Sequence, residues 1–222
     1  MGTSSAARAR NAKLEGRPRG RPREFDRERA LGKAAHTFWQ LGYEGASIAD
    51  LTAAMGITPQ SLYAAFHSKA ELYQEALAQY LVSAGAFCAR ALEEESTVEA
   101  AFVRLLEEAA HEYARSDQPR GCMLSTGVIT WAVENKAVAR HVAALRGKVL
   151  EAFRRRIERG KADGDLRADV DSAALARFLQ ALVQGMSLQA RDGASERELL
   201  TIARSASHEL ARLGARERRR AR

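Results

Sequence analysis

Cysteine is scarce in this 222-residue sequence. The two that occur, Cys88 and Cys122, have no CxxC spacing and follow no secretory signal. This argues against a disulfide framework and favours a reducing environment. Long apolar runs are also missing: no stretch approaches the ~20 residues needed to cross a bilayer, and the arginine-rich start lacks the apolar core of a signal peptide. We therefore expect a soluble, cytoplasmic protein.

Proline and β-strand alternation are equally scarce. Only four prolines occur, three of them at or before position 59, and the apolar spacing is helical almost throughout. An all-α fold of one or two compact domains is the expectation for this length.

Sequence motifs of enzymes and metal sites are missing as well. No GxSxG, HExxH, Walker or GxGxxG motif occurs, so we expect neither catalysis nor a cofactor. No metal site is expected either, because the candidate ligands are not paired at close helical spacing. These candidates are Cys88, Cys122, His111 and His141.

What the sequence does have is positive charge at both ends. The net charge is +7. Residues 1–25 carry seven basic and two acidic side chains, and residues 214–222 carry five and one, so the body between them is slightly acidic. Residues 1–23 offer little that could form a core. A near-neutral globule with basic ends is compatible with a polyanionic partner.

Capping residues and glycines divide the chain into helices. Helices are expected over 26–41, 47–55, 58–66 and 68–94, with Gly42 and Gly56 ending the first two. Good N-caps precede all four: Asp26, Ser47, Thr58 and Ser68. Further helices are expected over about 97–115, 121–131, 135–160, 171–190 and 195–213.

Two of these helices, 47–55 and 58–66, are joined at Gly56-Ile57 with the spacing of a helix-turn-helix. Four apolar residues can hold the pair against the first helix: Leu51, Met55, Leu62 and Phe66. The outer side of the second helix then carries residues that can enter a major groove.

The stretch FWQLGYEGASIADLTAAMGITPQSLYAAFHSKAELY resembles the DNA-binding domain of the TetR family of transcriptional regulators. The likeness lies in the aromatic and Gly-Tyr end of the first helix, the serine cap, the Gly-Ile turn and the pattern Ser-Leu-Tyr-x-x-Phe-x-Ser-Lys-x-x-Leu. It extends from about Glu24 to Tyr80. It implies a DNA-binding domain over 24–84, with the motif at 47–66, and a helical effector-binding and dimerisation domain over 85–213. A basic tail, 214–222, follows.

The resemblance also implies roles for single residues. Phosphate contacts fall to Ser47, Tyr63 and Lys69, with His67 beside them, and such contacts fix register without reading sequence. Base reading falls to Ala49, Thr58, Pro59, Gln60, Ser61 and Ala64. Gln60 can make a bidentate contact with adenine.

Within the basic arm, GRPRGRPREF, the stretch RGRP at Arg19–Pro22 resembles the core of an AT-hook. Its arginines are suited to a narrow A·T-rich minor groove: Arg17, Arg19, Arg21 and Arg23. A solvated tail is the alternative. For the C-terminal RERRRAR, a solvated tail is the preferred interpretation.

Two late helices carry regular apolar stripes. One has heptad spacing: Leu199, Ala203, Ala206, Leu210 and Leu213. The helix before it carries a similar stripe: Leu175, Phe178, Leu182 and Met186. A monomer could bury both stripes internally, but the resemblance favours a two-fold, four-helix dimer interface.

The middle helices offer a candidate effector pocket, with ordinary core packing as the alternative for each residue. The candidates are Phe87, Cys88, Phe102, Leu106, His111, Cys122, Met123, Trp131, Phe153 and Phe178. Cys122, in RGCML, is a redox-sensor candidate; a buried, inert cysteine is the alternative.

Together these features predict a sequence-specific, dimeric transcriptional regulator, a repressor that a small-molecule effector releases from a palindromic operator. Two alternatives stay open: an architectural DNA-binding protein without an effector, and a helical enzyme with a basic arm.

Overall fold

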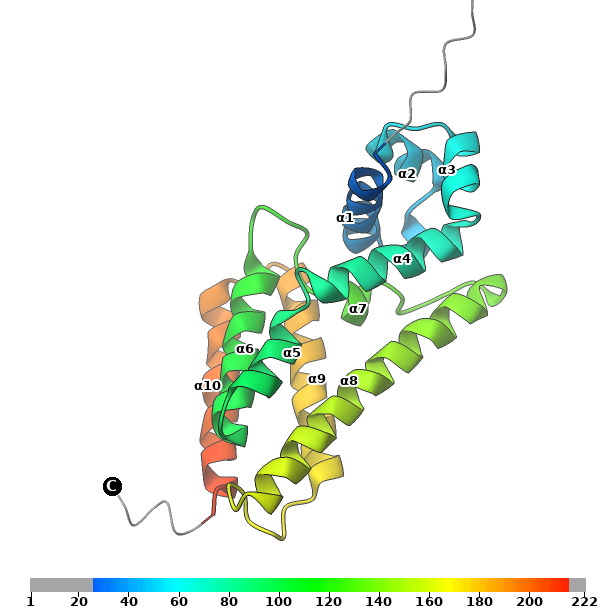
Figure 1. The fold of residues 1–222 in the computed structure, drawn as a ribbon. Coiled ribbons are helices and arrows are strands. Elements are labelled where there is room, and N and C mark those ends of the chain that lie inside the picture. The colour runs from blue at the N-terminus through cyan, green and yellow to red at the C-terminus, as the bar shows by residue number, and fades with distance from the viewer. Residues whose placement is uncertain (1–25, 216–222) are drawn as a thin grey trace, which may run out of the picture.

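The computed structural model describes residues 26–215, which fold into helices joined by short loops (Figure 1). The predicted arm, residues 1–23, and residues 216–222 of the predicted tail lie outside this range. Over the described range no strand forms beyond an isolated bridge between Leu166 and Gly214. The all-α prediction is confirmed.

Four helices build the N-terminal part: α1 (Arg27–Gly45), α2 (Ile48–Met55), α3 (Pro59–Phe66) and α4 (Lys69–Val82). Each begins at a predicted N-cap, whose side chain accepts a hydrogen bond from the backbone N–H three residues ahead. The four apolar residues predicted to hold α2 and α3 in place, Leu51, Met55, Leu62 and Phe66, are all buried.

An aromatic cluster joins α1 to α4. The ring of Tyr73 meets the ring of Phe38 edge-on, with centroids 5.0 Å apart, and the ring of Tyr43 with centroids 5.2 Å apart. Such pairs contribute about 0.5–1.5 kcal/mol beyond the area they bury. The helix-turn-helix is thereby fixed to the helix that leads into the rest of the molecule.

One predicted helix, 68–94, is broken in the structure. α4 ends at Val82, and α5 (Phe87–Glu94) begins after a turn. The Ser83 hydroxyl donates to the Gln79 carbonyl at 2.8 Å, and the Gly85 N–H donates to the Tyr80 carbonyl at 2.9 Å. A serine bonding back to its own helix and a glycine with weak helix propensity favour this break, which apolar periodicity alone does not reveal.

The C-terminal part consists of α6 (Val98–Ala114), α7 (Met123–Thr126), a 3-10 turn at Val133–Asn135, α8 (Lys136–Ala162), α9 (Ser172–Arg191) and α10 (Glu196–Leu213). Helix α6 packs against α5, α9 and α10, while α8 crosses α9 obliquely (Figure 1). The predicted helix 121–131 shrinks to α7, because Gly127 is followed by the β-branched run Val128, Ile129 and Thr130, which favours extended backbone.

Gly121 lies in a close contact just before α7. Its φ is 78°, and a Cβ added there would lie 2.6 Å from the Ser187 carbonyl oxygen of α9. Glycine is therefore required for both its backbone conformation and its lack of a side chain.

We expect Gly121→Ala to lower the free energy of unfolding by about 1–3 kcal/mol, because the left-handed backbone and the clash both cost energy. Urea denaturation followed by circular dichroism measures this. Gly147→Ala is the matched control: it lies in the exposed interior of α8 with nothing within 4 Å of the added Cβ. That variant should gain about 0.5–1 kcal/mol. Equal stabilities of the two variants would contradict the packing at Gly121.

Candidate DNA-binding surface and effector cavity

The outward face of α3 carries most of the residues predicted to read DNA bases. Thr58, Pro59, Gln60 and Ala64 are exposed and Ser61 is half-buried; the sixth, Ala49, is exposed on α2. The inward face holds Leu62 and Phe66, which are fully buried. Exposed and buried residues thus lie on opposite sides of α3, as the 3.6-residue helical period requires. The exposed side is available to a DNA groove.

Two of these residues are partly committed to capping α3. The Thr58 hydroxyl accepts from the Ser61 N–H at 3.2 Å, and the two hydroxyl oxygens lie 3.0 Å apart. Gln60, which is exposed, has the longest polar side chain on this face. Its amide is the group best able to make a bidentate contact with a base.

The four residues predicted to contact phosphates are placed differently from one another. Tyr63 is 46% exposed, and His67 is exposed in the turn between α3 and α4 with a φ of 61°. The Ser47 hydroxyl donates to the Asp50 carboxylate at 2.6 Å, and the bonds from Ser47 lower the pKa of Asp50. A phosphate oxygen accepts hydrogen bonds, and the Ser47 hydroxyl has a single proton to donate. The hydroxyl can therefore donate to a phosphate only if it stops donating to Asp50.

Lys69 is half-buried. Its ammonium lies 4.4 Å from the centroid of the Tyr43 ring, a cation–π contact that ties the start of α4 to the end of α1. Burial lowers the pKa of Lys69, and nearby Glu44 opposes this shift. In this arrangement the lysine stabilises the contact between α1 and α4 beside the candidate surface.

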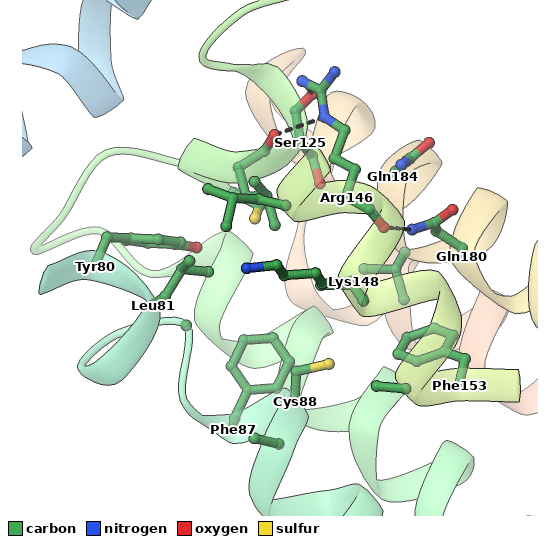
Figure 2. Close-up of a pocket in the computed structure, with 18 of the residues that line it drawn as sticks. Tyr80, Leu81, Phe87, Cys88, Ser125, Arg146, Lys148, Phe153, Gln180 and Gln184 are labelled. Carbon is green, nitrogen blue, oxygen red and sulfur yellow. Dashed lines mark hydrogen bonds between the residues drawn. The ribbon is translucent and has the colours of Figure 1, made fainter. Parts of the chain in front are cut away.

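A cavity of about 320 Å³ lies between α4, α5, α7, α8 and α9 (Figure 2). Most of its wall is apolar or aromatic, with Tyr80, Phe87 and Phe153 among the larger side chains. Both cysteines line it. Burial raises the pKa of the Cys88 thiol to about 12, so this thiol is protonated at neutral pH. A cavity of this size lies at the lower end of the range for small-molecule sites.

Four of the ten residues predicted to line a pocket do line this cavity: Phe87, Cys88, Cys122 and Phe153. The other six do not. Phe102, Leu106 and Met123 are fully buried in the packed core outside it. His111 lies on the outer side of α6, 3.4 Å from Glu196, and Trp131 and Phe178 are exposed. Helical periodicity indicates which residues face inward but not where packing leaves a void.

Of the residues that α8 contributes to the cavity, sequence reasoning found Phe153 and missed the others. The cavity-lining face has the helical spacing i, i+3, i+4, i+7, i+8: Leu145, Lys148, Val149, Ala152 and Phe153. A lysine inside an otherwise apolar stripe is the signal that could have indicated a ligand-facing position.

Residues 121–128, termed the α7 segment, connect the cavity to the helix-turn-helix. Cys122, Leu124 and Ser125 line the cavity. On the opposite side the segment is bonded to α1: the indole N–H of Trp39 donates to the Gly121 carbonyl at 3.1 Å, and the Tyr43 N–H donates to the Gly127 carbonyl at 2.8 Å.

Two arginines complete this connection. Arg146 of α8 donates to the carbonyls of Leu124, Ser125 and Val128 at 2.8–2.9 Å. Arg191, at the end of α9, donates to the carbonyls of Trp39 and Gln40 at 2.9 Å. Charge-assisted hydrogen bonds therefore hold the α7 segment to α8 and the end of α9 to α1.

The structure corrects the prediction for the dimer stripes. Leu199, Ala203, Ala206 and Leu210 are buried inside the chain, where α10 packs on α6, and Leu175 and Met186 of α9 are buried as well. Leu182 and Leu213 remain half-buried and Phe178 exposed. A second stripe on α9 is accessible instead: Ala174, Phe178, Ala181, Leu182, Gly185 and Leu188. The heptad stripe of α10 thus packs against α6 within the same chain.

Neither a metal site nor a membrane helix is found among residues 26–215. No group of three or more His, Cys, Asp and Glu side chains there is placed to hold a metal ion. None of the helices in that range is both long and apolar enough to span a bilayer.

Known proteins resemble the chain over most of its length. Residues 30–76 match the family of bacterial regulatory proteins named tetR, and residues 100–205 match a tetracyclin repressor-like C-terminal domain. The HTH-type transcriptional repressor ComR of Escherichia coli is 36% identical over 83% of this chain and 89% of its own. The repressor BdcR of the same bacterium is 31% identical over 86% and 92%.

A solved structure shows the same architecture. The TetR family transcriptional regulator CifR, as a cysteine mutant complexed with 26-base-pair operator DNA, superimposes with a TM-score of 0.82 and 42% identity, covering 85% of this chain and 98% of that one. The match with ComR spans 196 residues and so extends well beyond the helix-turn-helix. The chain therefore belongs to the TetR family, whose members are DNA-binding transcriptional regulators and not enzymes.

Proposed function

We propose that this DNA-binding repressor acts as a homodimer in the cytoplasm and leaves a palindromic operator when a small molecule enters the cavity. The observation that carries the proposal is the α7 segment, which lines the cavity on one side and is hydrogen-bonded to α1 on the other. The CifR structure supports the DNA-binding part, since that relative is complexed with operator DNA.

Release follows from the way the α7 segment is held. A ligand that displaces Leu124 or Ser125 must shift carbonyls that accept from Arg146. Because the same segment accepts from Trp39 and Tyr43, its movement changes the position of α1 and of the α2–α3 pair fixed to it. In a dimer, two recognition helices must stand about one DNA turn, ~34–36 Å, or more apart. A change in that separation prevents both from docking together.

The proposed contacts to DNA follow the surface of α3. Gln60 reads a base edge, while Tyr63 and His67 contact phosphates and Lys69 adds positive charge beside them. Ser47 contacts the backbone after its hydroxyl leaves Asp50. Short side chains at Ala49, Pro59 and Ala64 let α3 approach base edges and thymine methyl groups closely.

The proposed dimer interface is the accessible stripe of α9, residues 174–188. Charged side chains are absent from the α9 sequence between Phe178 and Ala190, and small residues such as Ala181 and Gly185 permit close helix packing. Phe178 and Leu188 are 45% and 49% exposed in the single chain. A two-fold contact through this stripe would bury both.

An architectural DNA-binding protein without an effector is the weaker alternative. It gives no reason for an apolar cavity whose wall is bonded to the DNA-binding part. The basic arm fits either function, and we propose that its arginines enter the minor groove beside the operator.

Substitutions on α3 test the docking. Tyr63→Phe should weaken binding to every sequence about fivefold for each half-site that the dimer contacts, because one phosphate hydrogen bond contributes about 1 kcal/mol. Lys69→Ala should also weaken it generally. Gln60→Ala should relax preference at a single base position, reducing discrimination there by about 1–3 kcal/mol. Mobility-shift assays with DNA upstream of the protein's own gene, and with random DNA, measure both effects.

The charge control for this experiment is Arg204→Ala, on the exposed face of α10, which should bind DNA like the wild type. If wild-type protein bound upstream and random DNA equally, the sequence-specific function would be wrong. If the α3 variants behaved like the control, the docking surface would be wrong.

A charge on α9 tests the interface. Phe178→Glu should fold normally, because the side chain is half exposed, yet migrate as a monomer in sedimentation analysis. Its operator affinity should also fall steeply, since two half-sites no longer act together. Arg140→Glu, an exposed charge change on α8, should stay dimeric. A dimeric Phe178→Glu variant would place the interface elsewhere.

Deletion of residues 1–23 tests the arm. The shortened protein should fold and dimerise normally but bind A·T-flanked operators more weakly. The slope of log affinity against log salt should become shallower by about 0.9 for every phosphate that an arm arginine neutralises in the full-length protein. Unchanged affinity would identify the arm as a solvated tail.

A further inference from the structure

The effector cavity has one polar side, and its chemistry narrows the class of ligand. Lys148 of α8 extends toward Tyr80 and Leu81, opposite the rings of Phe87 and Phe153 (Figure 2). Arg146 lies beside it on the same helix. Lys148 is an exposed residue that also lines the cavity, so its side chain is in contact with both solvent and the cavity. A ligand would therefore meet an apolar wall that carries one cation.

No carboxylate balances this positive charge. Lys148 and Arg146 are the charged side chains of the wall, and neither Asp nor Glu lines it. Burial raises the pKa of the Tyr80 and Tyr113 phenols and of the Cys88 thiol, so these groups are neutral at physiological pH. The wall attracts anions and disfavours cations.

The two cations differ in whether they are already hydrogen-bonded within the protein. Arg146 is committed to three backbone carbonyls of the α7 segment. The Lys148 ammonium makes no hydrogen bond or salt bridge to another described residue. Its flexible stem and three donors leave it available to a ligand. A charged group without a partner in the wall of an apolar cavity indicates a ligand of opposite charge.

We propose that the effector is an amphipathic organic acid whose apolar body fills the cavity and whose carboxylate binds Lys148. This proposal rests on the cavity being the effector site. The acid would approach Ser125 and Leu124, whose carbonyls Arg146 holds, and so would act on the segment bonded to α1. A neutral molecule of the same shape would pack against the same apolar wall but could not form the ion pair.

A matched pair of probes separates charge from shape: 4-phenylbutyrate and 4-phenylbutan-1-ol. Isothermal titration calorimetry on the full-length, DNA-free protein should show that the acid binds at least about tenfold more tightly than the alcohol. Lys148→Met keeps the apolar stem and removes the charge. It should lower affinity for the acid about 10- to 100-fold, the range for a charge-assisted bond, and leave the alcohol unchanged.

Two further variants complete the design. Lys148→Arg should retain the preference for the acid, because the charge is kept. Lys136→Met, an exposed lysine of the same helix outside the cavity, should behave like the wild type. The proposal is overturned if wild-type protein binds neither probe, if it binds both equally, or if Lys148→Met weakens both by the same factor.

Operator binding is measured separately, so the two proposals can fail independently. Selective acid binding with unchanged operator affinity would leave the ligand class intact and contradict the release mechanism. Release of the operator by the alcohol but not by the acid would confirm the release mechanism and overturn the ligand class.

Discussion

The rest of the structure depends on how the short α7 segment is bonded. It is too short and too rich in glycine to be stable as a helix by itself, and its peptide groups are largely buried. Buried carbonyls need donors, and here the donors come from two other elements. Trp39 and Tyr43 supply them from α1, and Arg146 supplies them from α8. On α9, the Ser187 hydroxyl accepts from the Cys122 N–H at 2.8 Å. A segment satisfied from several sides cannot move without changing all of these partners.

This arrangement explains why an arginine can lie beside an apolar cavity. Burial lowers the pKa of Arg146, which reflects the cost of removing its charge from water. The three carbonyls offset that cost and leave the guanidinium rigid. Lys148 stands two residues further along α8 without such partners. Helix α8 thus carries Arg146, which holds the α7 segment, and Lys148, which is available to a ligand.

The DNA-binding part is rigid for similar reasons. Side-chain caps begin each of its helices, and the Phe38, Tyr43 and Tyr73 rings lock α1 to α4. Arg27 adds a salt bridge to Glu75 at 2.8 Å and lies over the ring of Phe66. These contacts tie α3 to α1. In the proposed release mechanism they would transmit a small change at the cavity wall to the position of α3.

Much of this protein could be predicted from its sequence because the signals are local. N-caps, left-handed glycines and the 3.6-residue period depend on neighbours along the chain, so the four N-terminal starts and the outward face of α3 were predictable. The break at Ser83 and the shortness of α7 were harder, since both depend on weak helix formers whose effect competes with packing.

The tertiary structure alone decided which apolar residues face a void, a neighbouring helix or solvent. Phe102 and Phe153 have similar patterns, yet one fills the core and the other lines the cavity. The heptad stripe of α10 could equally face a second chain, but α6 covers it. Likewise, only the fold places Lys148 at an apolar cavity and Lys69 over the Tyr43 ring. The sequence determines where helices begin, through hydrogen bonds between neighbouring residues, and which residues must be buried, through the period of its apolar residues. Which buried surfaces meet depends on contacts between residues far apart in the chain.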